Sequence, residues 1–479
     1  MAERDTIDTA TQDTRALSST AGTLAAQGEI RILSTAGILG YGFPQESLDA
    51  GMARQPHMIS ADGGSSDPGP YYLGSGEAFV SRLAMRRDLR LMLHAALNAG
   101  IPFMVGTAGG AGGAPHLEML ASIVREIAAE DGLHFRMATI NAEQDKDFVA
   151  QRVESGRVRA LGRLPALNAA MLDRVSRIVA MMGPEPYMRA LDDGAQVILG
   201  GRSTDPAPFA AVALRAGMPP AAAWYAGKML ECGAAPATPK GPDCLLATIR
   251  ADSVTCEPTG TQRRCTVMSV ASHALHETAS PVRHTEPGGV LDTASCRFEQ
   301  VSEKAVRVTG MRWLPDHTYK VKLEGVEFVG HRAGTICATR DPRLIGQIDP
   351  YLELVKERVR TKAGDMGIAS SDYVLTIRCY GRNGVMAERE PIAHPSTHEL
   401  CFLVDVVAAN ADQAAAVLAL ARTNMLHNHF EGRQCTEGNM AIPYSPSDFK
   451  MGAVFRFILA HTMELNDPCE VFPIQYEEV

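Results

Sequence analysis

Short apolar runs alternate with amphipathic stretches over the first half of the chain. The runs have the length and composition of buried strands, and the stretches between them repeat apolar residues at helical spacing. The strands predicted in this way are residues 30–34, 57–61, 101–105, 135–140, 177–182 and 195–199. This alternation predicts an α/β domain with a largely parallel sheet that has helices on both faces.

Two stretches have a different composition and divide the chain. Residues 1–28 are rich in Thr, Ala, Asp and Ser without apolar periodicity, which predicts a mobile tail. Residues 233–242 read GAAPATPKGP, which has the composition of a linker. We therefore expect the α/β domain to span residues 29–242 and a further domain to span residues 243–479.

The further domain has a mixed pattern. Strand-like stretches occupy residues 244–250, 297–308 and 319–323. After a strand ending at residue 339, the pattern gives a helix, two strands and a helix, at residues 341–361, 373–380, 399–407 and 411–430. This succession predicts an α+β, ferredoxin-like C-terminal domain, which we expect to close over a site on the α/β domain.

Composition limits the classes of function. With 479 residues, of which 46% are hydrophobic and 21% charged, the chain can bury a large core. A net charge of -9 argues against a general affinity for nucleic acid or for an anionic membrane. There is no apolar run of membrane-spanning length and no secretory signal pattern, so we expect a cytoplasmic protein. Large cytoplasmic enzymes are commonly symmetric, and we expect a homo-oligomer.

The densest motif is a glycine-rich loop that follows the strand predicted at residues 101–105. Five glycines occur within residues 106–113, and Pro115 then opens a helix. Backbone N–H groups at such a turn can bind a phosphate or carboxylate, with Gly109 and Gly110 as the expected contacts. The alternative is a tight corner in which glycine permits positive φ and close packing. The spacing fits neither a P-loop nor a dinucleotide fingerprint, so we expect no cofactor.

Polar loops also follow two other predicted strands. Ligands of open α/β sheets bind at the carboxyl ends of the strands, so these loops should meet the glycine loop there. One contains Asp62 and Ser65, and the other contains Arg202, Ser203, Thr204 and Asp205. Arg202 could bind a carboxylate or phosphate, or it could pair with a neighbouring acid, and the two aspartates could serve only as turn and cap residues.

Four residues are candidates for acid–base catalysis. Glu277 lies beside His276 and shortly before Glu286 in a segment rich in titratable groups. His116 opens the helix after the glycine loop, and Asp205 belongs to the loop of Arg202. Such groups can move a proton next to a carbonyl when burial or a nearby charge brings their pKa toward neutrality. The alternatives are a surface carboxylate at Glu277 and an exposed imidazole at His116. No cysteine pair has C-x-x-C spacing, and we expect no metal site.

At these motifs the sequence resembles the acyclic terpene utilisation AtuA family, over about residues 31–472. The resemblance rests on residues 107–110, 201–205, 273–281, 287–289, 322–325 and 443–448. It departs from the family pattern at residues 275–278, which read LHET where LYEN is usual, and in lacking Asn after Thr107. The resemblance implies a role in the breakdown of branched acids through CoA thioesters and supplies no catalytic residue.

These observations together favour an enzyme that acts on a small-molecule carboxylate or an acyl-CoA thioester. We expect a lyase or hydratase in the catabolism of branched or terpenoid acids, in which the anion-binding loops hold the substrate and Glu277 or His116 moves a proton. Two alternatives stay open. One is an acyl transferase or hydrolase that acts on the same thioester, and the other is a non-catalytic subunit that binds an acyl-CoA or a partner enzyme.

Overall fold

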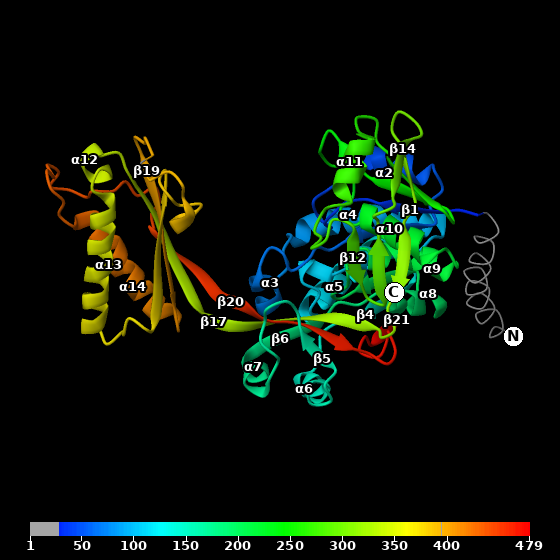
Figure 1. The fold of residues 1–479 in the computed structure, drawn as a ribbon, viewed down its shortest axis with the longest axis horizontal. Coiled ribbons are helices and arrows are strands. Elements are labelled where there is room, and N and C mark those ends of the chain that lie inside the picture. Colours follow the sequence, from blue (N-terminus) through cyan, green and yellow to red (C-terminus); the bar gives the residue numbers. More distant parts are fainter. Residues whose placement is uncertain (1–27, 394) are drawn as a thin grey trace. The chain divides into compact units, whose positions relative to one another are not determined.

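The computed structural model describes residues 28–393 and 395–479, so the predicted tail lies outside the described residues except for Gly28. The described chain forms two compact units. The first comprises residues 28–327 and 457–479, and the second comprises residues 328–456. The long strands β17 (Lys320–Thr339) and β20 (Asp448–Glu464) carry the chain into the second unit and back (Figure 1).

The first unit is built on a ten-stranded sheet with the order β14-β15-β10-β9-β1-β2-β3-β7-β4-β21. Its centre is parallel and consists of β1 (Ile30–Ser34), β2 (Met58–Asp62), β3 (Phe103–Gly106), β7 (Val197–Gly200) and β4 (Arg136–Ile140). Antiparallel strands flank the centre, namely β9 (Leu245–Ile249), β10 (Ser253–Pro258), β15 (Val306–Thr309) and β14 (Arg297–Gln300) on one side and β21 (Ile474–Glu478) on the other. The sheet is therefore mixed, and the expectation of a largely parallel sheet applies only to its centre.

Helices cover both faces of the sheet, as the fully apolar strands predict. Successive strand residues point to opposite faces, so Ile32 and Met104 pack into one core while Leu33 and Val105 pack into the other. The first core includes apolar residues of α9 (Ala207–Arg215) and α10 (Pro220–Leu230). The second includes those of α4 (Arg82–Ala99) and α5 (Ala114–Asp131).

One predicted strand of the parallel sheet lies elsewhere. Residues 175–180 form β6 (Val175–Ala180), which pairs antiparallel with Leu323–Glu327 of β17. The prediction of a strand is correct, but its place is not. Its partner follows more than a hundred residues later, and a local apolar pattern carries no information about so distant a partner.

The composition change near residue 240 lies within the first unit. There the chain runs from α10 through β8 (Ala237–Thr238) to β9. Because β9 pairs antiparallel with β1 over the register Ile30↔Ile249 to Ser34↔Leu245, residues beyond 243 extend the sheet that begins at residue 30.

The second unit has the predicted succession of elements. After β17 come α12 (Pro342–Ile345), α13 (Ile348–Asp365), β18 (Tyr373–Tyr380), β19 (Leu400–Ala408), α14 (Ala411–His427) and β20. The strand order is β18-β19-β17-β20, and one core joins the sheet to α13 and α14. Its assignment to a ferredoxin-like fold stays a prediction. The unit is an insertion, because residues 457–479 return to the first unit.

The remaining helices and strands of the first unit are short. They are α2 (Gln45–Met52), α3 (Pro70–Ser75), α6 (Lys146–Glu154), β5 (Val158–Ala160), α7 (Ala169–Arg174), α8 (Glu185–Asp192), β11 (Arg264–Cys265), α11 (Val267–His273), β12 (Arg283–Glu286), β13 (Gly289–Asp292) and β16 (Arg312–Pro315). Within the described residues, no helix combines the length and the apolarity that a membrane crossing requires.

Candidate functional site

The polar loops meet at the carboxyl ends of the parallel strands. The N–H of Thr107, after β3, donates to the carbonyl of Gly201, after β7, at 3.0 Å. The N–H of Arg202 donates to the carbonyl of Gly112, also at 3.0 Å. Asp62 ends β2, and the next residue, Gly63, donates its N–H to the carbonyl of Gly106 at 2.8 Å. The loops of β2, β3 and β7 therefore form one connected surface at this edge.

Close packing accounts for the glycines of the loop. Gly112 has φ +66°, and a Cβ there would lie 2.2 Å from the nitrogen of Arg202. A Cβ on Gly109 would lie 2.9 Å from that of His116, and one on Gly110 would lie 2.8 Å from that of Phe79. The two glycines predicted to contact a ligand are thus buried against protein atoms, which is the packing alternative that the sequence left open.

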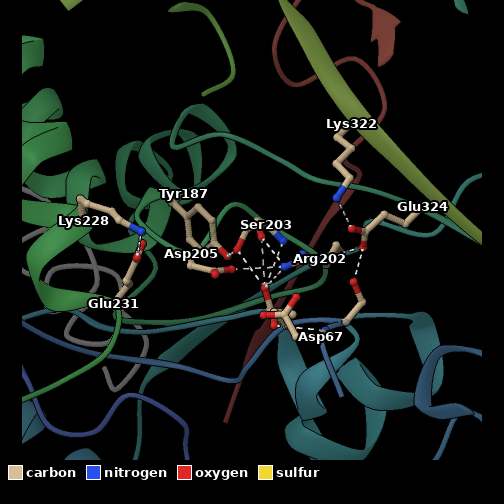
Figure 2. Close-up of polar contacts among 12 residues, drawn as sticks. Asp67, Tyr187, Arg202, Ser203, Asp205, Lys228, Glu231, Lys322 and Glu324 are labelled. Carbon is tan, nitrogen blue, oxygen red and sulfur yellow. Dashed lines mark hydrogen bonds and ion pairs between the residues drawn. The ribbon is translucent and has the colours of Figure 1, made fainter. Parts of the chain in front are cut away.

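Arg202 lies at the centre of this edge, between Asp205 and Glu324 (Figure 2). Its side chain is 4% exposed, and its Nε donates to Oε2 of Glu324 at 3.1 Å. Its Nη1 lies 3.3 Å from Oδ1 of Asp205 and donates to the carbonyl of Ser203 at 2.9 Å. Burial lowers the pKa of Arg202, but the charges of Glu324 and Asp205 outweigh that effect and raise it. The guanidinium is therefore a fixed cation whose charge protein carboxylates already balance.

The other predicted binding residues surround Arg202. Ser203 is fully buried and accepts a hydrogen bond from the Tyr187 hydroxyl at 3.2 Å. Thr204 is buried beside the carboxyl group of Glu286. Ser65 is partly exposed, and its hydroxyl accepts from the N–H of Asp67 at 3.3 Å, which closes the loop after β2. Only Ser65 of these polar side chains lies near the surface.

Four carboxyl groups in this region have raised pKa values. Burial is the main cause for Asp62, Asp205, Glu231 and Glu286. The negative charge of Asp205 raises the pKa of the other three further, and that of Asp67 raises the pKa of Asp205. The pKa of Glu286 is raised to about 7. We refer to these four residues as the acid cluster. Acids with raised pKa values at one edge of a sheet are a common feature of catalytic sites.

The cations near the acid cluster do not neutralise all of it. Lys228 forms a buried ion pair with Glu231 at 2.5 Å, and the positive charge of Arg202 is shared between Asp205 and Glu324. Glu324 also pairs with Lys322 at 2.7 Å, and these two cations lower its pKa to about 2 although burial alone would raise it. Since buried charges require partners, Glu286, whose pKa is raised to about 7, is partly protonated near neutral pH. It can therefore donate a proton as well as accept one.

Glu277 and His276 line a cavity of about 770 Å³. Nε2 of His276 lies 3.2 Å from Oε1 of Glu277, whose side chain is 43% exposed. Burial raises the pKa of Glu277, the charge of His276 opposes this effect, and the charge of Asp205 adds to it. Cys232 lines the same cavity, and burial together with the charges of Glu231 and Glu277 raises its pKa. The cavity and the acid cluster thus belong to one electrostatic environment.

Backbone strain is found at two residues of this region. Thr107 has φ 44° and Glu277 has φ 51°, a conformation that costs free energy for residues with a Cβ. The Thr107 hydroxyl contacts both the Arg202 side chain and the N–H of Ser203. Such strain concentrates where the surrounding structure must place a side chain in one position.

His116 has a different environment from the exposed one that the sequence allowed. It is fully buried, and its Nε2 lies 3.0 Å from the carbonyl of Glu77. Burial lowers its pKa, and the positive charge of Arg177 acts in the same direction. It packs against Gly109 beneath the glycine loop. No group of three or more His, Cys, Asp or Glu side chains suited to a metal ion occurs within residues 28–393 and 395–479.

Sequence reasoning did not select Lys228, Glu231, Glu324 or Tyr187. A signal existed for the first two, because residues 220–231 read PAAAWYAGKMLE, and two charges three residues apart in an otherwise apolar helix indicate a buried ion pair. Glu324 lies in β17, 122 residues after Arg202, and no local pattern links the two residues. Glu286 was noted only as a neighbour of Glu277.

Comparison with known proteins gives one family. The model of the family described as "Acyclic terpene utilisation family protein AtuA" matches residues 84–238 and 247–454. No curated protein and no solved structure matches the chain. The matched residues include the loops of β3 and β7, the acid cluster except Asp62, and Glu324. Because the match covers well over half of the sequence, the chain belongs to the acyclic terpene utilisation AtuA family and has a role in acyclic terpene utilisation.

Proposed function

We propose that this protein is a lyase of the hydratase type, which adds water to an unsaturated branched carboxylic acid or its acyl-CoA thioester, or removes it. The observation that carries the proposal is the acid cluster, which holds more carboxyl groups than its cations neutralise and whose charges act on Glu277 and Cys232 in the lining of the cavity. Family membership adds a metabolic setting in which branched, unsaturated acids are the expected substrates.

Water addition next to a carbonyl requires two proton transfers. One group must take a proton from water as its oxygen attacks the β-carbon, and another must give a proton to the α-carbon. In the proposed mechanism, Glu277 is the base, because it lines the cavity and is partly exposed to water. Glu286 is the acid, since its pKa of about 7 keeps part of it protonated at neutral pH. Elimination of water uses the same two groups in the opposite roles.

The surrounding residues would hold the two carboxyl groups in these states. Lys228 balances Glu231, so that pair adds little net charge near Glu286. Arg202 fixes Asp205, which in turn raises the pKa of Glu286 and Glu277 by its negative charge. In this proposal Arg202 and Asp205 position and tune the reacting groups, and they do not bind the substrate.

Product analysis tests the reaction class. The full chain is incubated with branched α,β-unsaturated acids and with their CoA thioesters, and products are followed by mass spectrometry. Hydration increases the mass by one water, hydrolysis releases free CoA thiol, and acyl transfer requires an added acceptor. Glu277→Gln and Glu286→Gln should each lower turnover roughly a hundredfold, the usual contribution of one general acid or base.

A matched control is the same substitution at Glu353, which is 72% exposed in the second unit and pairs with Lys356 at 2.7 Å. Glu353→Gln should retain full turnover and melting temperature. Full activity in Glu277→Gln, or thiol release without a hydrated product, would refute the proposed function.

A further inference from the structure

The first unit has a second, basic recess close to the cavity of Glu277. It has a volume of about 830 Å³ and lies along β11 and the turn after β14. Its lining is polar and includes three cations, Arg263, Arg264 and Lys304, and one acid, Glu303. The other members are Thr238, Pro239, Thr261, Gln262, Thr266 and Gln300.

The three cations have no acidic partners. In the described part of the chain, no carboxylate lies within ion-pair distance of Arg263, Arg264 or Lys304. Lys304 donates to the carbonyl of Gly260 at 2.6 Å, and the buried Nε of Arg263 has no hydrogen-bond partner. Most buried or half-buried arginines of this unit, including Arg202, have carboxylate partners. Unpaired guanidinium groups in a recess are suited to phosphate, which they bind through two parallel hydrogen bonds.

The basic recess continues into the cavity of Glu277. A smaller cavity of about 360 Å³ lies between them, and it shares Thr238 with the recess and Lys240 and His276 with the Glu277 cavity. The Arg263 guanidinium also lies against Gly241, where a Cβ would be 2.1 Å from it, and Gly241 lines the Glu277 cavity. The three cavities therefore follow one another, with the unpaired cations at one end and Glu277 at the other.

From this arrangement we propose that the substrate is an acyl-CoA thioester whose nucleotide phosphates bind in the basic recess. The proposal rests on the proposed function and decides between its two substrate classes. A free branched acid has one charge and needs no second anionic site at a distance from the reacting carbons. A thioester of CoA has an acyl end without charge, a long polar pantetheine arm and several phosphate charges at the far end. Those parts correspond to the Glu277 cavity, the middle cavity and the recess.

Binding measurements test the assignment independently of turnover. Isothermal titration calorimetry measures the affinity of the full chain for each of three probes, CoA, ADP and pantetheine. We expect CoA to bind at least tenfold more tightly than pantetheine, and higher salt should weaken CoA binding because the contacts are ionic. Arg264→Ala should weaken CoA binding about tenfold or more, the scale of a lost charge-assisted hydrogen bond, and should leave pantetheine binding unchanged.

Controls separate this effect from loss of the fold. Arg264 is exposed, so its variant should keep the parent melting temperature. Arg378→Ala, at an exposed arginine of the second unit, should bind CoA like the parent protein. Equal affinities for CoA and pantetheine, an equal effect of both arginine variants, or an affinity for ADP that matches that for CoA would each overturn the proposal.

The outcome is distinguishable from that of the proposed function. A chain that binds CoA through Arg264 but hydrates none of the thioesters retains this inference and refutes the reaction. A chain that hydrates free acids and does not bind CoA retains the reaction and refutes this inference.

Discussion

Removal of the Arg202 guanidinium should destabilise the first unit strongly and in a pH-dependent way. In Arg202→Met the side-chain volume is largely kept, but Glu324 and Asp205 lose their buried cation. Breaking a buried ion pair at one partner costs about 3–5 kcal/mol, because the other charge stays buried without compensation. We expect a loss of that size at pH 7.

The pKa of Glu324 gives a second value for the stability that this group of charges contributes. Arg202 and Lys322 lower its pKa from 4.5 to about 2, against the effect of burial. That lowering corresponds to about 3 kcal/mol of stability at neutral pH. Since the folded pKa lies below the unfolded value, this stability is fully present above pH 4.5 and is lost as pH falls toward 2.

The variant should respond to pH in the opposite sense. Without Arg202, only Lys322 opposes the effect of burial on Glu324, and Asp205 loses the cation that lowers its pKa most, so the folded variant takes up protons at a higher pH than the parent. The stability difference between parent and variant should therefore shrink as pH is lowered from 7.5 to 5. Replacement of both partners, in Arg202→Met with Glu324→Gln, should recover at least about 1 kcal/mol.

Urea unfolding followed by tryptophan fluorescence measures this difference. The chain has two tryptophans, Trp224 and Trp313, which stack at 5.3 Å within the first unit. The signal therefore reports on that unit without contribution from the second. As a control, Arg82→Met removes a surface pair with Glu126 and should cost at most about 1 kcal/mol. A loss below about 1 kcal/mol for Arg202→Met, or a loss that does not change with pH, would refute this reasoning.

Three further predictions follow from the same region. Gly112→Ala should destabilise the first unit by about 2 kcal/mol or more in urea unfolding, because its Cβ would lie 2.2 Å from the nitrogen of Arg202 at a positive φ; a neutral effect would contradict the packing of the loop. Lys228→Met leaves Glu231 buried without its cation and should cost about 3 kcal/mol of unfolding free energy at pH 7. The loss should be smaller at lower pH, where Glu231 binds a proton. A loss that is the same at pH 7 and at lower pH would contradict this prediction. If Glu286 donates a proton from a pKa of about 7, turnover should fall as pH rises through 7, and a flat pH–rate profile would exclude that role.

Local patterns predicted much of the fold but not the pairing of distant elements. The central strands of the first unit and the order of elements in the second unit follow from apolar periodicity, because burial on one or both faces of an element determines which of its successive residues are apolar. The strand predicted at residues 177–182 is present as β6, at residues 175–180, but its antiparallel partner in β17 lies far along the chain. The insertion of the second unit is equally non-local, since only residues 457–479 reveal it by returning to the first unit.

The candidate site shows the same limit. The convergence of the loops of β3 and β7 follows from the rule for parallel strands, and Arg202 was selected by it. Whether Arg202 is free for a ligand depends on Glu324, which no spacing connects to it. The raised pKa of Glu286 depends on its burial and on the charges of Asp205 and Lys228 from two other segments, and burial is a property of the folded chain alone.

The late position of β21 has a consequence for biosynthesis. Its partner β4 is complete when residue 140 has been made, but Ile474–Glu478 are made only after the whole second unit. During that interval the outer edge of β4 has unpaired N–H and C=O groups and can pair with a strand of another nascent chain. The second unit is contiguous in sequence, so it can fold during this time. A nascent chain that has reached residue 456 therefore contains the whole second unit but still has an unpaired edge on β4.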